Sequence, residues 1–419
     1  MKNLNICIIG LGYVGLPLAL NFARQNLLTT GLDVNKLLIN DLKKNISRIT
    51  SVKNKELKNI ANKNKLSFSY EYSEVAKSTH IIICVPTPLK KNQPDLSYVI
   101  STCNSLMEHI KKGQTIIFES TSYPGTTRNV ISKILSKGKL KAEKDFFICF
   151  SPERENPGMT SILYKDIPKV ISAISSKGLV NIKKLYGIVF KTLVVADTVE
   201  EAEAAKLLEN CFRAVNIAFI NELRDFFYKQ KIDIWNVIKV AKTKPFGFMP
   251  FYPSIGAGGH CIPIDPKYLT WYARKNKGKL SILENSLTVN KKTPLKVFAF
   301  IKDIMNEKKI INPKIKLYGI TYKKNVNDSR ESSSLKLFKY LDNEYDNLDF
   351  YDPYIDKITI NNKLIKRTKT QYEKDNKLIS IIGVNHDSIN YKKILSNSKI
   401  VIDLSNVYKT IKNKKIILI

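Results

Sequence analysis

The sequence lacks the cysteine and histidine patterns that hold small secreted domains or metal ions. It has six cysteines and four histidines in 419 residues, and no two cysteines form a Cys-x-x-Cys pair. A chain of this length buries a core without disulfide bonds. We therefore expect a reducing, cytoplasmic location and no bound metal.

Long apolar runs are also missing. No stretch approaches the roughly 18 uninterrupted apolar residues of a membrane span, so we expect no membrane partner. The first 23 residues resemble a signal peptide in having a lysine followed by an apolar run. Regularly spaced glycines and Pro17 argue against that interpretation, and no Ala-x-Ala site follows.

Acidic residues are in short supply, with 37 Asp and Glu against 69 Lys and Arg, which gives a net charge of +32. Such a charge is typical of nucleic-acid binding. The lysines, however, are scattered through every segment and form no aromatic-interleaved block. We expect no nucleic-acid partner, and instead a positive field that favours small anions such as nucleotides.

The N-terminal region carries a dinucleotide-binding pattern. Residues 5–9 form an apolar, β-branched run, residues 10–15 read Gly-Leu-Gly-Tyr-Val-Gly, and residues 16–25 have helical character. Glycine permits a tight turn and close approach of a pyrophosphate to the helix N-terminus. A Gly-x-Gly-x-x-Gly sequence between a strand and a helix predicts a Rossmann fold.

An acid follows at the distance that this fold requires. Residues 29–33 predict a second strand, which ends at Asp33. A carboxylate there binds both ribose hydroxyls of NAD and repels the 2′-phosphate of NADP, so NAD is the expected cofactor. The alternative is that Asp33 is only a turn residue.

Three more apolar strands are predicted at residues 80–85, 115–121 and 146–150. Thr87 and Thr121 stand at the ends of two of them and should face the carboxyl edge of the sheet, where ligands bind. Glu153 follows the third strand and is a candidate base. The alternative for Glu153 is a loop carboxylate paired with Arg154.

The middle of the chain predicts one long helix over residues 199–231, because the segment has no Gly or Pro and is rich in Ala, Leu and Glu. Lys206 and Asn210 lie four residues apart and share a face. A snorkelling surface lysine is the alternative for Lys206. The helix is too apolar to stand alone, and we expect it to form a dimer face.

A glycine-rich loop leads to a single cysteine, Cys261, which two prolines follow. A thiol between permissive and rigid backbone is a candidate nucleophile; the alternative is a buried, inert cysteine. Asp265 has a helix cap as its alternative role. Another helix is predicted to begin at residues 290–294.

A second strand and helix alternation begins at residue 314 and continues to residue 403. The predicted fold is therefore α/β, with two Rossmann-like doubly wound domains joined by a long central helix and a helical region. We expect an NAD-binding domain at residues 1–195, a central helical dimerisation domain with the cysteine at 196–305, and a UDP-sugar-binding domain at 306–419.

Together these motifs resemble the nucleotide-sugar dehydrogenases, the UDP-glucose and GDP-mannose dehydrogenase family, over nearly the whole chain. Residues 244–253 are similar to the UDP-N-acetylglucosamine 6-dehydrogenase branch. The resemblance rests on residues 10–15, Val85-Pro-Thr-Pro88, Glu119-Ser-Thr121, Ser151-Pro-Glu153, Glu203-Ala-Ala-Lys206 with Asn210, Gly258-Gly-His-Cys261-Ile-Pro-Ile-Asp265, and residues 323–330.

The resemblance implies an NAD-dependent, four-electron oxidation of the C6 hydroxyl of a UDP-sugar to a uronic acid. The reaction passes through a cysteine thiohemiacetal and thioester, and serves surface polysaccharide synthesis. The preferred substrate is UDP-N-acetylglucosamine, with UDP-glucose, UDP-N-acetylgalactosamine and UDP-N-acetylmannosamine as alternatives. A homodimer or higher homo-oligomer is implied as well.

Site residues are carried over by the same resemblance. The implied catalytic residues are Cys261, Lys206, Asn210, Asp265, Glu153 and Thr121. The implied NAD contacts are Gly10, Gly12, Tyr13, Val14, Gly15, Asp33, Thr87, Thr121 and Arg330. The implied substrate contacts are Glu153, Glu155, Lys206, Asn210, Tyr252, Gly256, Gly258, Tyr322 and Lys323.

The sequence departs from the family pattern at two places. Ser254 and Ile255 stand where the family usually has glycine and proline, which affects the sugar-contacting loop. Leu38 stands where the family often has a cation, which leaves Lys36 for an adenosine phosphate. Two other functions remain open: a two-electron dehydrogenase of the 3-hydroxyacid type, which does not need Cys261, and a non-catalytic nucleic-acid-binding protein.

Overall fold

The computed structural model describes residues 4–49, 52–61, 63–154 and 163–419. The chain forms two compact units, the first with residues 1–209 and 267–278, the second with residues 210–266 and 279–419. One division falls inside helix α7 (Val199–Lys229). The domain boundaries expected at residues 195 and 305 stay a prediction.

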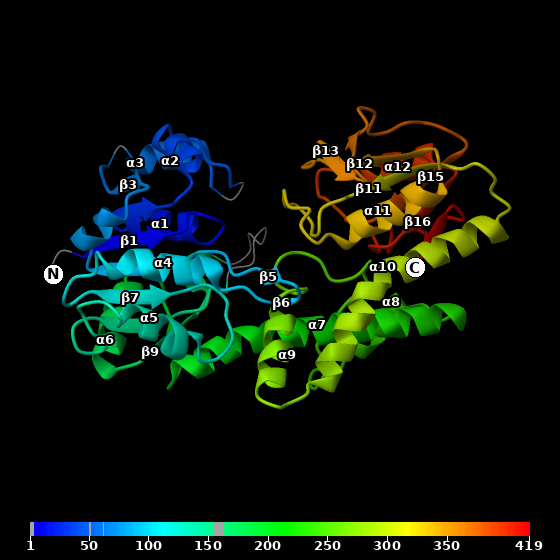
Figure 1. Ribbon diagram of the computed structural model, residues 1–419. Coiled ribbons are helices and arrows are strands. Elements are labelled where there is room, and N and C mark those ends of the chain that lie inside the picture. Colours follow the sequence, from blue (N-terminus) through cyan, green and yellow to red (C-terminus); the bar gives the residue numbers. More distant parts are fainter. Residues whose placement is uncertain (1–3, 50–51, 62, 155–162) are drawn as a thin grey trace. The chain divides into compact units, whose positions relative to one another are not determined.

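The first unit is built on a sheet of eight strands in the order β10-β9-β8-β7-β4-β1-β2-β3 (Figure 1). Neighbouring strands are parallel except β8 and β9, which are antiparallel. The strands are β1 (Asn5–Ile9), β2 (Leu28–Leu32), β3 (Leu66–Ser69), β4 (His80–Ile83), β7 (Thr115–Phe118), β8 (Phe147–Phe150), β9 (Lys169–Ala173) and β10 (Leu193–Val195). The short strands β5 (Leu89–Lys90) and β6 (Gln93–Pro94) pair with each other.

Helices cover this sheet. Its helices are α1 (Gly15–Arg24), α2 (Lys36–Lys43), α3 (Asn54–Ala61), α4 (Ser97–Met107), α5 (Ser132–Leu135) and α6 (Ser176–Tyr186). Short 3₁₀ helices at Tyr72–Lys77 and Tyr164–Asp166 and a π turn at Thr127–Ile131 complete it. Ile6 and Ile8 of β1 share a core with α1 and α6 because alternate strand residues face the same side.

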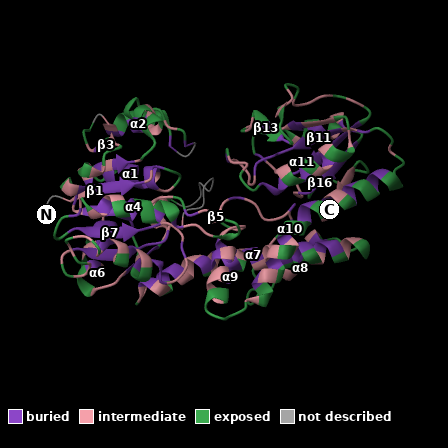
Figure 2. Cartoon of the chain, viewed as in Figure 1, coloured by how far each residue is buried: buried purple, intermediate pink, exposed green. Residues whose placement is uncertain are grey.

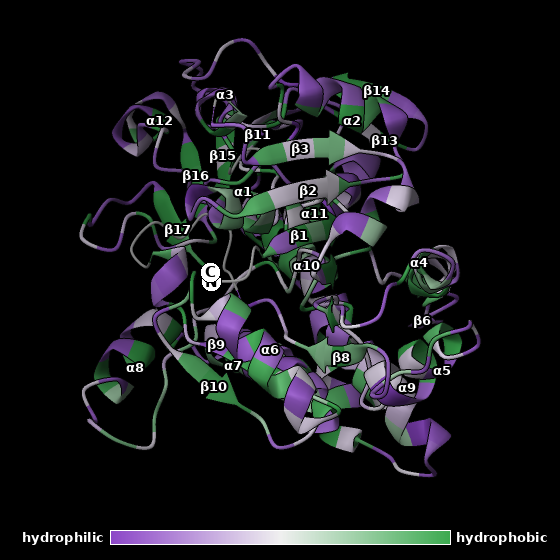
Figure 3. Ribbon diagram, turned by 90° about the vertical axis from the view of Figure 1, so that its left-hand side faces the viewer, coloured by the Kyte–Doolittle hydropathy of each residue, from purple (hydrophilic) through white to green (hydrophobic). Residues whose placement is uncertain are grey.

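Burial and hydropathy explain why these segments fold as they do. Every residue of β4, β7 and β8 is buried, and β7 is purple in Figure 2. Strand β4 reads His-Ile-Ile-Ile, the β-branched composition of strands covered on both faces. Helix α6 carries both apolar and polar residues, as a helix with one buried face does (Figure 3).

The second unit contains an all-parallel sheet in the order β12-β11-β15-β16-β17. The strands are β11 (Lys314–Tyr318), β12 (Leu348–Tyr351), β15 (Leu378–Ile382), β16 (Ile400–Asp403) and β17 (Ile416–Leu418), with a hairpin of β13 (Lys357–Ile360) and β14 (Lys363–Lys366). Helices α10 (Ser281–Glu307) and α11 (Ser333–Glu344) share one core with this sheet, and α12 (Tyr391–Asn397) shares another. The predicted second Rossmann-like fold is confirmed.

The segment between the sheets is helical, as predicted, and the long predicted helix is α7. It is followed by α8 (Ile234–Ala241) and α9 (Asp265–Lys275). The prediction that a helix begins at residues 290–294 is wrong, because α10 begins at Ser281 and passes through Pro294. Pro294 has no N–H, so the Asn290 carbonyl lacks its usual hydrogen-bond partner within the helix. The backbone at Gly256 packs against this carbonyl, because a Cβ added at Gly256 would lie 3.2 Å from the Asn290 oxygen.

No helix within the described ranges combines the length and apolar character that crossing a membrane requires.

Candidate functional site

The turn between β1 and α1 uses its three glycines differently. Gly10 has φ +92°, and a Cβ added at Gly15 would lie 1.9 Å from the Gly10 carbonyl oxygen. Both positions therefore need glycine for the chain's own packing. A Cβ at Gly12 would meet no protein atom within 4 Å. Gly12 thus leaves open space beside the N-terminus of α1, where Val14 provides no side-chain cap. The N-terminus of a helix favours an anion.

Asp33 connects the end of β2 to this turn. Its Oδ2 accepts a hydrogen bond of 2.9 Å from the Leu11 N–H, and its Oδ1 accepts one of 2.9 Å from the Asn35 N–H. The hydrogen bond from Asn35 is the local turn contact that the alternative interpretation of Asp33 predicts. The hydrogen bond from Leu11 links Asp33 to the glycine turn. The Lys36 ammonium lies 5.1 Å from the centre of the Tyr70 ring.

The two threonines lie at neighbouring strand ends. Thr87 follows β4 and is buried, and Thr121 follows β7 and is half-buried. Since β4 and β7 are adjacent and parallel, both residues stand at the carboxyl edge of the sheet, as predicted. The Tyr268 hydroxyl donates to the Thr87 carbonyl at 2.9 Å and so supports this loop.

Glu203 of α7 organises the loop after β7. Its carboxylate accepts hydrogen bonds from Gly125 N (2.6 Å), Thr127 N (2.8 Å) and Thr127 Oγ1 (2.6 Å). Burial raises the pKa of Glu203 to about 7, against the opposing effect of these donors. Glu203 belongs to a motif singled out in the sequence, but this role was missed. Lys206, three residues later, is half-buried.

Glu153 lies in a network of donors rather than in a pair with its neighbour. Its Oε2 is 3.2 Å from the Lys169 ammonium and accepts from the Tyr164 hydroxyl at 3.1 Å. The alternative interpretation, an ion pair between Glu153 and Arg154, is wrong. The Arg154 guanidinium pairs with Glu209 at 2.7 Å, and Arg154 contacts Glu153 through its backbone N–H. Glu155 lies outside the described residues.

In the second unit, Cys261 is exposed, so the alternative of a buried thiol is wrong. Of the other five cysteines, Cys84 is half-buried and four are buried. The Cys261 carbonyl accepts from the N–H groups of Ile264 (3.1 Å) and Asp265 (2.8 Å), and this turn leads into α9.

Asp265 is more than a helix cap. It is buried, and its Oδ2 accepts from the Nδ2 of buried Asn210. The Asn210 Oδ1 in turn accepts from the Arg213 guanidinium. These two hydrogen bonds together set the orientation of the Asn210 amide. Arg213 was not identified from the sequence, although residues three apart on a helix share a face.

The glycine stretch before Cys261 packs closely against the loop that follows β11. A Cβ at Gly258 or Gly259 would lie 3.0 Å or 2.7 Å from the side chain of Tyr322. The Gly259 N–H donates to the Arg330 carbonyl at 3.2 Å. Predicted substrate residues far apart in sequence, Gly258 and Tyr322, are therefore in contact.

The departure at residues 254 and 255 is accommodated within this unit. Ile255 is buried in the same core as α10 and α11. The Ser254 carbonyl accepts from Arg224 at 2.8 Å, and its N–H donates to Asn221 Oδ1 at 2.9 Å. Tyr252 is exposed and stacks on Trp235 with 5.9 Å between ring centres.

A buried histidine and aspartate hold the loop that carries Lys323. Asp352 Oδ2 accepts from the N–H groups of Ile320 and Thr321, and His386 Nδ1 accepts from the Asn325 N–H at 3.0 Å. Because Nδ1 is an acceptor, the ring proton sits on Nε2, which is 3.2 Å from Asp352 Oδ2.

Lys323 and Arg330 of this loop differ in their surroundings. Burial and the neighbouring Arg213 lower the pKa of Lys323. Arg330 is an exposed side chain whose guanidinium pairs with Asp328 at 2.7 Å.

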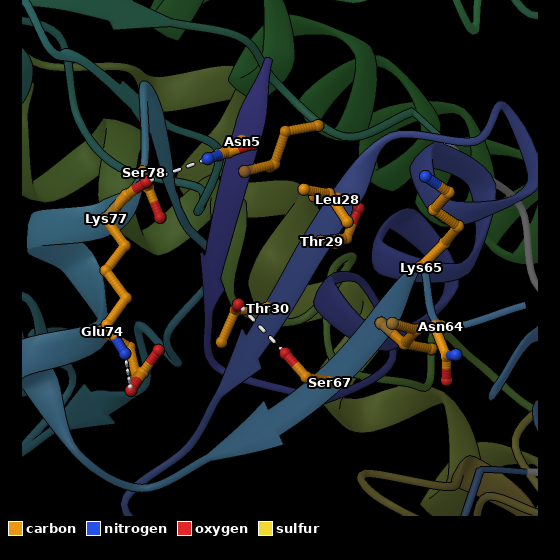
Figure 4. Close-up of a pocket in the computed structure, with 12 residues that line it drawn as sticks. Asn5, Leu28, Thr29, Thr30, Asn64, Lys65, Ser67, Glu74, Lys77 and Ser78 are labelled. Atoms are coloured by element: carbon orange, nitrogen blue, oxygen red, sulfur yellow. Dashed lines mark hydrogen bonds and ion pairs between the residues drawn. The ribbon is translucent and has the colours of Figure 1, made fainter. Parts of the chain in front are cut away.

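A cavity of about 400 Å³ lies elsewhere in the first unit (Figure 4). Its lining includes Asn5 of β1, Leu28 of β2 and Leu66 of β3, the first residues of their strands. The cavity is therefore at the opposite edge from the glycine turn, and it contains none of the predicted site residues. In the described part of the chain, no three His, Cys, Asp or Glu side chains gather as metal ligands.

Two Rossmann-like folds, the first with open space at Gly12 and an acid, Asp33, after β2, define a nucleotide-binding protein as the class of protein. Comparison with known families is more specific. Residues 4–189 match the NAD binding domain, residues 200–292 the central domain and residues 316–410 the UDP binding domain of the UDP-glucose/GDP-mannose dehydrogenase family. The chain belongs to this family, and it is an oxidoreductase that uses NAD and has a UDP-sugar binding domain.

Individual relatives cover most of the chain. A UDP-N-acetyl-D-glucosamine 6-dehydrogenase of Pseudomonas aeruginosa is 34% identical over 364 residues, which are 85% of this chain and 84% of the relative. A UDP-N-acetyl-D-mannosamine dehydrogenase of Pyrococcus horikoshii is 31% identical over 84% of each chain. The solved structure of a UDP-D-ManNAc dehydrogenase from P. horikoshii aligns with a TM-score of 0.87 and 28% identity, covering 99% of this chain and 98% of that one.

Proposed function

We propose that this enzyme oxidises the C6 hydroxyl of UDP-N-acetylglucosamine to a carboxylate in two successive two-electron steps. The observation that carries the proposal is the exposed thiol of Cys261, at the end of a glycine stretch packed against the UDP binding domain. When bound, NAD accepts a hydride from C6 in each step. A single oxidation to an aldehyde would not need a nucleophilic thiol.

The first unit is suited to hold the dinucleotide. Gly12 leaves room for the pyrophosphate, and Asp33 presents a carboxylate to the ribose hydroxyls. Thr87 and Thr121 bring polar groups to the same edge of the sheet. We assign Tyr13, Val14 and Arg330 to this set by family resemblance.

Cys261 acts after the first oxidation. Its thiolate adds to the C6 aldehyde, and a proton goes to the oxygen, which gives a thiohemiacetal. Loss of the second hydride and of the hydroxyl proton gives a thioester. The covalent bond retains the intermediate while the spent cofactor is exchanged.

Lys206 and Asn210 stabilise negative charge that develops on the C6 oxygen, where a fixed cation or N–H donor is worth several kcal/mol. Asp265 fixes the Asn210 amide and positions a water or proton for this step. Glu153, with Thr121, activates the water that hydrolyses the thioester. Tyr252, Gly256, Gly258, Tyr322 and Lys323 hold the nucleotide sugar, a role that Glu155 shares by resemblance alone.

The choice of sugar rests on similarity. A UDP-N-acetyl-D-glucosamine 6-dehydrogenase is 34% identical to this chain over the 364 aligned residues, and a UDP-N-acetyl-D-mannosamine dehydrogenase is 31% identical over 359. The second relative makes UDP-N-acetylmannosamine the second candidate substrate. Both carry an acetamido group, so we expect either to be preferred over UDP-glucose.

The test is a panel of these three substrates and UDP-N-acetylgalactosamine, scored for NADH formed per sugar consumed. We expect a ratio of about two and the highest kcat/KM with UDP-N-acetylglucosamine. Cys261→Ser should lose sustained turnover, whereas the control Cys211→Ser, at a buried cysteine, should keep the ratio. A ratio near one, or an unimpaired Cys261→Ser enzyme, would contradict the double oxidation.

A further inference from the structure

A buried lysine lies between two carboxylates at the edge of the first sheet. Lys169 is 2% exposed, and its Nζ is 3.1 Å from Glu119 Oε2 and 3.2 Å from Glu153 Oε2. Glu119 is also 2% exposed. Such a group of charges away from water is costly unless each charge is matched, so its presence needs an explanation.

The reversed strand β9 creates this arrangement. Glu119 follows β7, and Glu153 follows β8, so both stand at the carboxyl edge of the parallel strands. Strand β9 runs antiparallel to β8, and Phe150 pairs with Ser172. Continuing this register by three residues places Lys169 opposite Glu153. A fully parallel sheet would have put the first residue of β9 at the other edge.

The electrostatic surroundings of Lys169 give Glu119 and Glu153 different roles. Burial lowers the pKa of Lys169, but Glu119 and Glu153 outweigh it and raise that pKa, so the ammonium stays charged. Burial raises the pKa of Glu119, which is held from its other side by the Tyr186 hydroxyl. The side chain of Glu119 has no exposed surface through which a substrate could reach it, and it serves to hold the lysine.

Glu153 is half-buried and is fixed through both of its oxygens. The Arg154 N–H donates to Oε1 at 2.7 Å, while Lys169 and Tyr164 donate to Oε2 at 3.2 Å and 3.1 Å. A carboxylate with this many directed donors has one orientation. Of these donors, only Lys169 is an ion held by a second buried charge.

We propose that Lys169 is a positioning residue that holds the Glu153 carboxylate in one orientation for the thioester hydrolysis assigned to it above, with Glu119 as its anchor. The inference rests on the proposed function. In this step water adds to the thioester carbon, its proton passes to Glu153, and the Cys261 sulfur leaves as thiolate. Removal of Lys169 should slow this step and spare both oxidations.

The experiment compares Lys169→Met with wild type and with Lys191→Met, an exposed lysine paired with Asp166. Each is mixed with NAD and the UDP-sugar that wild type oxidises fastest. In Lys169→Met we expect two NADH per active site at the wild-type rate, then steady turnover slower by about 10²-fold. Intact-protein mass should show the uronyl group on Cys261, and no such adduct in wild type or Lys191→Met.

Loss of the lysine leaves Glu119 buried without its ion-pair partner, which lowers stability. Glu119→Gln is therefore the second variant, because it keeps the shape and loosens the hold on Lys169. It should also accumulate the adduct, and Lys169→Arg should restore hydrolysis. If Lys169→Met does not fold, the adduct in Glu119→Gln decides the question.

Folded variants that hydrolyse the thioester as fast as wild type, or that slow both oxidations without an adduct, would overturn the inference and leave a structural ion pair. That outcome differs from failure of the proposed function. In the latter case wild type itself would form one NADH per sugar, or would never depend on Cys261.

Discussion

Glycines at the β1–α1 turn have separable roles at the scale of single residues. At Gly15 an added methyl group would collide with the Gly10 carbonyl, whereas at Gly12 it would enter open space. Gly15 therefore serves the fold, whereas we assign the space at Gly12 to the cofactor.

We expect Gly12→Ala to fold with unchanged thermal stability and to raise KM for NAD about tenfold, a loss of about 1.4 kcal/mol. The added methyl occupies space that we assign to the pyrophosphate. Gly15→Ala should instead lower the free energy of unfolding by roughly 1–3 kcal/mol or more through overpacking. Thermal melts and NAD titrations measure both effects. An unchanged KM in Gly12→Ala would show that the cofactor does not approach this turn.

Between elements, Glu203 ties α7 to the loop after β7, and this link depends on pH. Burial raises its pKa from 4.5 to about 7. The folded chain therefore binds this proton more tightly than the unfolded chain does. The resulting stabilisation is complete below about pH 4.5 and is lost as pH rises through about 7.

Glu203→Gln removes this titration. Relative to the variant, we expect the wild-type free energy of unfolding to fall by about 3 kcal/mol between pH 4.5 and 7.5. Urea denaturation at several pH values measures the difference. The control Glu200→Gln, which removes a partly exposed pair with Arg128, should change this slope little. Parallel pH curves for wild type and Glu203→Gln would show that the carboxyl ionises normally in the folded chain.

At the scale of the whole molecule, the homodimer remains a prediction, and an exposed face of α7 is the surface that we expect to form it. Phe212, Phe219 and Phe226 of α7 are 45%, 57% and 57% exposed and follow one another at seven-residue intervals. Side chains at this spacing lie on one side of a helix, and exposed aromatic stripes mark interaction surfaces.

Replacement of Phe219 and Phe226 by lysine should convert a dimer of two 47.8-kDa chains into a monomer, because buried charge opposes association. Light scattering after gel filtration reports the mass. Leu37→Lys, at an exposed apolar residue of α2, should leave the mass unchanged. A wild-type protein that is already monomeric at micromolar concentration would contradict the dimer.

Local signals account for what could be predicted. Strands β1 and β16 begin and end at the predicted residues, because short β-branched runs are recognised directly from the sequence. Helix α7 was also predicted, since it lacks breakers over its whole length. Short elements such as α8 and the β13–β14 hairpin have no comparable signal, and they were missed.

By itself, the sequence determined the two α/β alternations, the glycine turn with its acid, and the cysteine stretch, since each depends on neighbours along the chain. Only the tertiary structure decided that α10 passes through Pro294 and that Lys169 lies between Glu119 and Glu153. A helix tolerates a proline when packing supports the freed carbonyl. A buried charge acquires its partners only when the register of a reversed strand brings distant residues together.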